Sequence, residues 1–258
     1  MEAVKELVLA RIHLRAIIPL LEDISEFDTT VKQIIKEWNM PIQFQLPGGE
    51  AATTLSFRQG KIIALRDKIN ASRITLTFSN AETLNAIFQG RSKKSPRPNL
   101  TGLFHLKKLL QVDPLLKRIE YYMKPEKEIL EDEKTFEQCV RLTLNALVFG
   151  VKEIGEHDPE MKPLAKCLPD GVVEIRVIAG PAVHLAVNNG LFTPAKGRAE
   201  KPNAYLEIAD MQTAWAMVQG NLDQYAAIGS GKIKIRGLIP LIDGVNPIID
   251  RLSLYMAD

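Results

Sequence analysis

The sequence is poor in the residues that most often form catalytic or metal sites. It has two cysteines, Cys139 and Cys167, and four histidines among its 258 residues. Neither cysteine belongs to a Cys-x-x-Cys pair or to a Cys/His spacing typical of zinc, and no histidine stands with a serine, cysteine or paired carboxylate in a catalytic order. We therefore expect no catalytic residues, no metal and no cofactor. We interpret both cysteines as reduced structural thiols of a cytoplasmic protein.

Long apolar runs and a large charge of either sign are also missing. No stretch approaches the roughly 20 apolar residues of a membrane span, and the net charge of +2 gives no electrostatic argument for nucleic acid. Only residues 91–97 are locally basic, and there we favour a solvated loop over an anion or membrane contact. We expect no nucleic-acid partner and no integral membrane association. A transient membrane contact and the oligomeric state stay open.

What the sequence does have is an internal repeat. Shifted by 130 positions, residues 11–90 align with residues 141–220 without a gap, and identical pairs such as Asp28/Asp158 and Gly60/Gly190 run through the window. After a change of register, residues 114–123 align with residues 247–256. A period this long excludes solenoids and propellers, whose units run about 20 to 50 residues. It predicts two tandem globular domains, residues 1–126 and 127–258, each large enough for a core of its own.

Both halves show the same order of predicted elements. Helical spacing of apolar residues predicts a long first helix, and Asp28 and Asp158 are good N-caps for a shorter second one. Apolar runs separated by turn residues then predict three strands, a fourth strand, a helix, a fifth strand and a C-terminal helix that begins at Pro114 or Pro247. The fifth strand is predicted at residues 100–106 in the first half and 232–236 in the second. The predicted fold class is α+β, with a five-stranded antiparallel-type sheet covered on one face by helices in each half.

The second half resembles the sterol carrier protein type 2 (SCP2) lipid-transfer family over about residues 170–245. The resemblance rests on Leu206-Glu-Ile-Ala-Asp210, on a helix ending at Gly220, and on Ala227-Ile-Gly-Ser-Gly-Lys-Ile-Lys-Ile-Arg-Gly237. It implies a sheet covered by helices, with a hydrophobic cavity that accepts fatty acyl chains, sterols or similar lipids. The first half carries the pattern only through the repeat, because a shorter basic loop replaces residues 221–230. One interpretation is that the first copy is a packing partner while the second retains the ligand.

The resemblance implies a ligand site in the second half, between the helix bearing Trp215, the strand after Lys232 and the C-terminal segment. Its candidate residues are Trp215, Met217, Ile228, Ile233, Ile235, Leu238, Ile239, Ile242 and Val245. Trp215 aligns with Asn85, so the fold does not require an aromatic ring there. A pocket, a domain interface and chance filling are all consistent with this tryptophan.

Apolar stripes form core more often than ligand sites, so two functions stay open. We favour a non-enzymatic protein that binds or carries an apolar ligand, a fatty acyl or sterol-like lipid. The alternative is an accessory or protein-interaction module whose cavities are filled by side chains.

Overall fold

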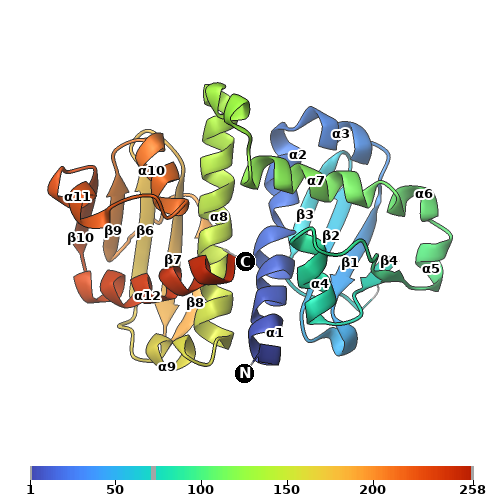
Figure 1. Cartoon of the computed structure of the whole chain (residues 1–258), viewed down its shortest axis with the longest axis horizontal. Helices are drawn as coiled ribbons and strands as arrows, with labels where there is room; N and C mark the ends of the chain where they lie inside the picture. Colours follow the sequence, from blue (N-terminus) through green and yellow to red (C-terminus); the bar gives the residue numbers. More distant parts are fainter. Residues whose placement is uncertain (1, 71–73, 257–258) are drawn as a thin grey trace. The chain divides into compact units, whose positions relative to one another are not determined.

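The computed structural model describes residues 2–70 and 74–256. These residues form two compact units, and the boundary along the chain lies between Lys124 and Pro125 (Figure 1). The first unit contains α1 (Glu2–Ile12), a π-helical turn (His13–Ile17), α2 (Leu20–Phe27), α3 (Thr29–Ile35), β1 (Met40–Gln45), a 3-10 turn (Pro47–Gly49), β2 (Ala52–Arg58), β3 (Lys61–Leu65), β4 (Ile74–Thr77), α4 (Ala81–Phe88), β5 (Arg97–Pro98), α5 (Leu100–Leu103), α6 (Leu106–Leu109) and α7 (Val112–Met123). After a 3-10 turn (Lys127–Glu131), the second unit contains α8 (Glu133–His157), α9 (Met161–Ala165), β6 (Gly171–Val177), β7 (Ala182–Asn188), β8 (Leu191–Lys196), β9 (Ala204–Ile208), α10 (Met211–Val218), α11 (Gln224–Gly229), β10 (Ile233–Gly237) and α12 (Ile239–Met256).

The two sheets have the same strand order. They run β3-β2-β1-β4-β5 in the first unit and β8-β7-β6-β9-β10 in the second. The α+β class and the five strands of each sheet are thus confirmed. The sheets are mixed rather than wholly antiparallel, because β1 pairs with β4 and β6 with β9 in parallel.

The parallel pairs have a topological cause. The two hairpins end at β3 or β8, on the far side of the sheet, so the chain must run back across it before it can pair with the free edge of β1 or β6. Buried polar side chains lie under these return segments: Gln43 Oε1 accepts a hydrogen bond from Ile69 N at 2.8 Å, and Glu174 Oε2 accepts one from Ala199 N at 2.8 Å.

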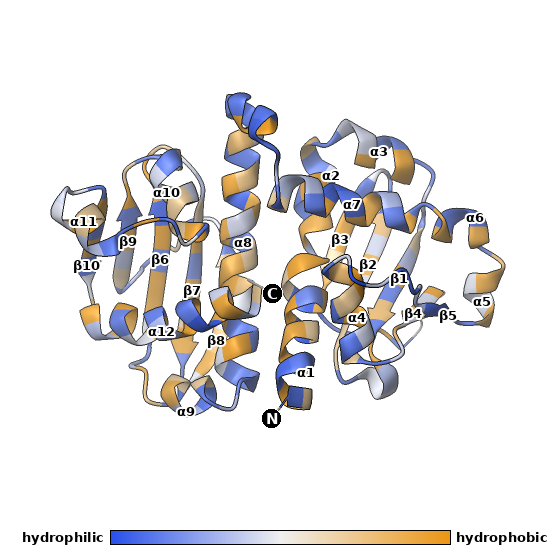
Figure 2. Cartoon of the chain, viewed as in Figure 1, coloured by the Kyte–Doolittle hydropathy of each residue, from blue (hydrophilic) through white to orange (hydrophobic). Residues whose placement is uncertain are grey.

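The hairpin turns and helix caps form where local residue chemistry predicts them. Asn189 and Gly190 adopt φ angles of 49° and 71° between β7 and β8, as a type I′ turn requires. The Asp28 carboxylate caps α3 by accepting a hydrogen bond from Val31 N, 2.8 Å away. Apolar residues recur at helical spacing along α8 and are gathered on its buried side, with polar residues between them in sequence (Figure 2).

An equivalent carboxylate network in each unit ties the start of α3 or α9 to the last helix, α7 or α12. Asp28 Oδ2 accepts hydrogen bonds from Arg118 Nε at 2.8 Å and from the Tyr122 hydroxyl at 2.9 Å. In the second unit, Asp158 Oδ2 accepts from Arg251 Nε at 3.1 Å and from the Tyr255 hydroxyl at 2.8 Å. Burial opposes ionisation of Asp158, but the hydrogen bonds from the tyrosine, the arginine and two backbone amides lower its pKa below the ordinary value.

The strand predicted at residues 100–106 is wrong. β5 consists of Arg97–Pro98 alone, and the helices α5 and α6 follow it. Proline has no N–H to continue a strand ladder, and the Asn99 side chain caps α5 by accepting a hydrogen bond from Gly102 N at 2.9 Å. The C-terminal helices also begin earlier than predicted, at Val112 and Ile239, so that Pro247 lies inside α12.

Candidate functional site

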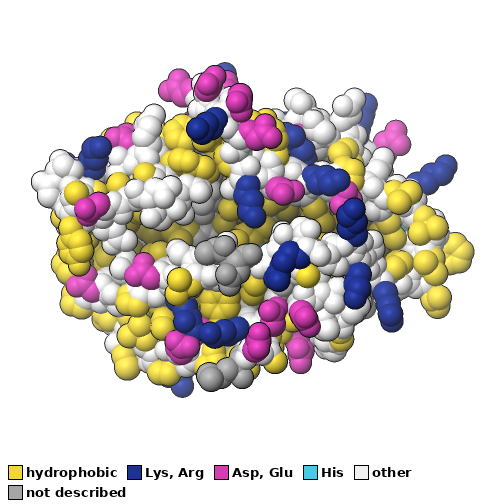
Figure 3. Space-filling view, viewed as in Figure 1, with side chains coloured by type: hydrophobic (Ala, Val, Ile, Leu, Met, Phe, Trp, Pro, Cys, Tyr) yellow, Lys and Arg dark blue, Asp and Glu magenta, His cyan; other side chains and the backbone are white. Residues whose placement is uncertain are grey.

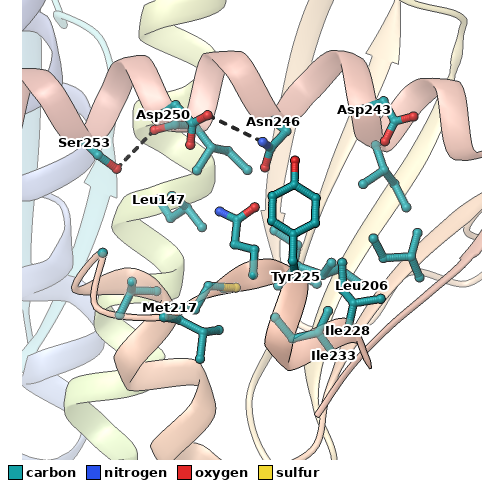
Figure 4. A pocket seen from close by; sticks show the side chains of 18 residues that line it. Leu147, Leu206, Met217, Tyr225, Ile228, Ile233, Asp243, Asn246, Asp250 and Ser253 are labelled. Atoms are coloured by element: carbon teal, nitrogen blue, oxygen red, sulfur yellow. Dashed lines mark hydrogen bonds between the residues drawn. The ribbon is translucent and has the colours of Figure 1, made fainter. Parts of the chain in front are cut away.

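A cavity of about 470 Å³ lies in the second unit between α10, α11, β10 and α12 (Figure 4). Five of the nine residues proposed from the sequence line it: Met217, Ile228, Ile233, Ile235 and Ile242. The other lining residues come from the same elements, from the loop between α10 and α11, and from α8, β6 and β9. They are Leu147, Ile175, Leu206, Val218, Gly220, Leu222, Gln224, Tyr225, Asp243, Asn246, Ile249, Asp250 and Ser253.

The sheet forms an apolar wall of this pocket. Ile175 on β6 pairs with Leu206 on β9, which in turn pairs with Ile235 on β10. These three side chains therefore form one row across three neighbouring strands. Side chains alternate between the two faces of a strand, so Ile233 and Ile235 point to the same face and both line the cavity.

The short helix α11 contributes Gln224, Tyr225 and Ile228 to the lining of the pocket. Asp223 caps the N-terminus of α11, because its carboxylate accepts a hydrogen bond from Ala226 N at 3.0 Å. The buried Ala227 anchors the helix to the rest of the unit. Its two large apolar side chains are exposed instead, Tyr225 at 90% and Ile228 at 45%, although both line the cavity. An apolar ligand would cover surface on these residues that now contacts water.

The polar residues of the pocket lie mainly on α12. Asp243, Asn246, Asp250 and Ser253 follow the spacing of one helix face and line the cavity beside Ile242 and Ile249 (Figure 4). The Asn246 amide nitrogen lies 3.5 Å from Asp250 Oδ2, and the Ser253 hydroxyl donates to the Ile249 carbonyl at 3.2 Å. No lining residue is a lysine or an arginine. The pocket therefore joins an apolar interior to an acidic rim.

The other four proposed residues lie outside the cavity lining. The Trp215 ring makes an edge contact with Phe136 of α8, with the ring centroids 6.1 Å apart. Val245 is buried in the core, Leu238 is half-buried with its N–H bonded to the Asn203 carbonyl at 2.8 Å, and Ile239 is 40% exposed. Their role in ligand binding stays a prediction.

The acidic rim and Tyr225 were not predicted from the sequence to line a pocket. The only signal for the rim was the spacing 243, 246, 250 and 253, which an ordinary solvated helix face also produces. Tyr225 was missed because its counterpart segment in the first half has a different length.

Two potentially reactive side chains, Cys139 and His13, are buried, whereas the Cys167 thiol is exposed. Burial raises the pKa of the Cys139 thiol to about 11, which disfavours the nucleophilic thiolate. His13 is buried between Asn85 and Phe88, and burial lowers its pKa to about 4. Within residues 2–70 and 74–256, no group of three or more His, Cys, Asp or Glu side chains could hold a metal ion. In the same ranges, no helix combines the length and apolar character needed to cross a bilayer.

Comparisons with known proteins find structural neighbours only. No family model and no curated protein matches the sequence. Among solved structures, the sterol carrier protein domain 2 of Helicoverpa armigera is 22% identical, covering 43% of this chain and 88% of its own, with a TM-score of 0.34. A UbiJ-SCP2 ubiquinone synthesis protein is 15% identical, with 43% and 96% covered and a TM-score of 0.35. A palmitated SCP2L2 from Aedes aegypti is 18% identical, with 40% and 90% covered and a TM-score of 0.31. All three are named as sterol carrier or SCP2 proteins.

Proposed function

We propose that the second unit binds and carries an apolar ligand, a fatty acyl or sterol-like lipid, without chemical conversion. The observation that carries this proposal is the cavity of about 470 Å³ with its apolar wall of strand residues. Ligand pockets typically measure about 300 to 1,000 Å³ and are mostly apolar.

The acidic rim limits which polar groups a ligand could place there. Asp243 and Asp250 are acidic side chains, and no lysine or arginine lines the pocket to offset them. A free carboxylate at this rim would meet like charge, whereas a hydroxyl could donate a hydrogen bond to an aspartate. We therefore expect an amphiphile with a neutral polar end to bind more tightly than the fatty acid of equal length.

The first unit is the better candidate for the alternative function, a packing or interaction module. At its α1–α4 contact, Asn85 Nδ2 donates to the Glu6 carboxylate at 2.6 Å, and the His13 ring stacks on Phe88 with the centroids 4.6 Å apart. Side chains thus fill this helix contact. We propose that residues 1–126 and 127–258 are tandem SCP2-like domains, the first divergent and the second ligand-binding.

The decisive experiment combines extraction with titration on the full chain. Organic extraction of the purified protein followed by mass spectrometry should yield a stoichiometric lipid, and a pyrene-labelled fatty alcohol should bind to the stripped protein. The matching pyrene-labelled fatty acid should bind more weakly at neutral pH. A protein that co-purifies with no lipid and binds neither probe would exclude the carrier function, whereas equal binding of both probes would exclude only the role of the rim.

A further inference from the structure

The segment that the sequence predicted as a strand presents a cluster of apolar side chains to solvent. Five large residues of α5, α6 and their flanks are largely exposed: Leu100 (80%), Leu103 (48%), Phe104 (88%), Leu106 (55%) and Leu110 (77%). Figure 3 shows these yellow side chains gathered at the end of the first unit where Figure 1 places α5 and α6. Single exposed apolar residues are common, but a cluster of five within eleven positions indicates an interaction surface.

This exposure belongs to an anchored element rather than to a loose loop. Asn99 pairs with β4, donating its N–H to the Thr75 carbonyl at 2.9 Å and accepting from Thr75 N through its side chain at 3.2 Å. Gly102 is buried, and a Cβ at this position would lie 2.9 Å from Pro98 Cβ. The buried glycine thus packs α5 onto the sheet edge, so the large side chains of the same turn are directed outward.

The segment that carries the cluster has charge of one sign. Between Glu82 and Asp113 the sequence contains six basic residues and no acidic one: Arg91, Lys93, Lys94, Arg97, Lys107 and Lys108. All but Lys108 are exposed, and Lys108 is half-buried. Figure 3 shows dark blue side chains next to the yellow cluster.

We propose that this surface, residues 91–110, docks on the headgroup region of an anionic lipid membrane. Apolar side chains that enter the interface, next to cations that meet anionic headgroups, are the two components of interfacial binding. Each Lys or Arg near such a surface strengthens binding by about fivefold. A second copy of the same surface fits poorly, because it would bring twelve like charges together (six from each chain). The proposal does not rest on the pocket, since all its residues belong to the first unit.

The test is co-sedimentation of the full chain with vesicles of phosphatidylcholine alone or with about a third phosphatidylglycerol. We expect binding to the anionic vesicles at least tenfold stronger than to the neutral ones, and weaker in 0.5 M salt because screening reduces surface attraction. Phe104→Ser/Leu110→Ser and Lys107→Glu/Lys108→Glu should each lower binding at least tenfold. Phe104, Leu110 and Lys107 are exposed and Lys108 is half-buried at the surface, so circular dichroism should show unchanged folding.

Matched controls lie in the same unit. Ile63→Ser/Leu65→Ser removes two exposed apolar side chains of β3, and Lys32→Glu/Lys36→Glu makes the same change of charge on α3. Both controls should bind vesicles as the wild type does. The proposal is overturned if the wild type ignores anionic vesicles, or if the control pairs lower binding as much as the test pairs. It is also overturned if sedimentation velocity shows a dimer that Phe104→Ser/Leu110→Ser dissociates.

Discussion

Filling the pocket from α10 should abolish most of the ligand affinity. Met217 lies on α10 with its side chain directed toward the cavity in Figure 4, and it is neither fully buried nor hydrogen-bonded through its side chain. Met217→Trp therefore adds bulk where the second unit has free space. The helix is capped independently, because Asp210 accepts a hydrogen bond from Thr213 N at 2.7 Å.

The size of the effect follows from the methylene groups that the new ring displaces. Tryptophan is larger than methionine by about six non-hydrogen atoms, and if about half of them enter the cavity, about three ligand methylenes lose their place. At about 0.8 kcal/mol for each buried methylene, binding weakens by about 2.4 kcal/mol, or about 60-fold. Stability should change by less than about 1.5 kcal/mol, because the side chain enters space that is already present.

The assay is titration of the full chain with a pyrene-labelled fatty alcohol, with urea unfolding as the check on stability. The matched control is Ile87→Trp, since Ile87 is the counterpart of Met217 in α4 of the first unit. The control should bind the probe as the wild type does. If Met217→Trp binds with unchanged affinity, or if only Ile87→Trp loses affinity, the ligand does not occupy this pocket.

Three further predictions concern stability. Because the pKa of His13 is about 4 in the folded state against 6.5 as the ordinary value, only the unfolded state takes up this proton as pH falls from 6.5 to 4. The free energy of unfolding should therefore drop by about 3 kcal/mol over that range, and a pH series of urea melts should show a shallower drop for His13→Gln. Gly237→Ala should lower the free energy of unfolding by more than about 3 kcal/mol, because a Cβ there would lie 2.1 Å from the Asn203 carbonyl oxygen. Gly231 has open space around it, so Gly231→Ala should cost only about 1 to 2 kcal/mol, the strain of an alanine in left-handed backbone. Equal losses in the two variants would refute the steric argument. Asp158→Asn should lower the free energy of unfolding by about 2 kcal/mol, because it weakens the contacts to Arg251 and Tyr255, and Asp28→Asn should have the same effect in the first unit. If urea melts show no loss of stability, these networks do not stabilise the fold.

Features set by neighbouring residues could be predicted from the sequence. The turn at Asn189 and Gly190 and the caps at Asp28 and Asp158 depend on side chains within a few positions of the backbone groups they serve. The parallel pairing of β1 with β4 depends instead on where the chain returns to the sheet, which no local pattern encodes. Residues 100–106 read as a strand by analogy with the second half, but Pro98 and Asn99 stop the strand and begin a helix.

Only part of the pocket lining could be predicted from the sequence. The apolar residues Met217, Ile233 and Ile235 were found because they belong to the segments that resemble the SCP2 family. Trp215 and Val245 have the same apolar character but point elsewhere, because the sequence does not fix which side of a helix faces a cavity once both sides pack against neighbours. The spacing of the polar residues on α12 could not assign them to a pocket, since charge on an amphipathic helix is normally solvated.

Comparison of aligned positions gives a physical reason why the two units should differ in ligand binding. Glu6 and Asn85 form a hydrogen-bonded pair in the first unit. Asn85 aligns with Trp215, and Phe136, which stands 130 positions after Glu6 just outside the aligned window, makes an aromatic contact with Trp215 in the second unit. Exchanging Asn85 alone would deprive the buried His13 ring nitrogen and the half-buried Glu6 carboxylate of a hydrogen-bond partner, at a cost of about 1 to 3 kcal/mol, so the positions are coupled.

The next turn of the same helix shows the consequence for the cavity. Phe88 stacks on the buried His13 ring in the first unit, whereas its counterpart Val218 lines the pocket in the second. A large ring packed against a neighbour occupies space that a valine leaves free. The polar pair and the stacked rings thus close the helix contact in the first unit, while the aromatic pair holds α10 against α8 in the second and leaves the adjacent valine to face the cavity.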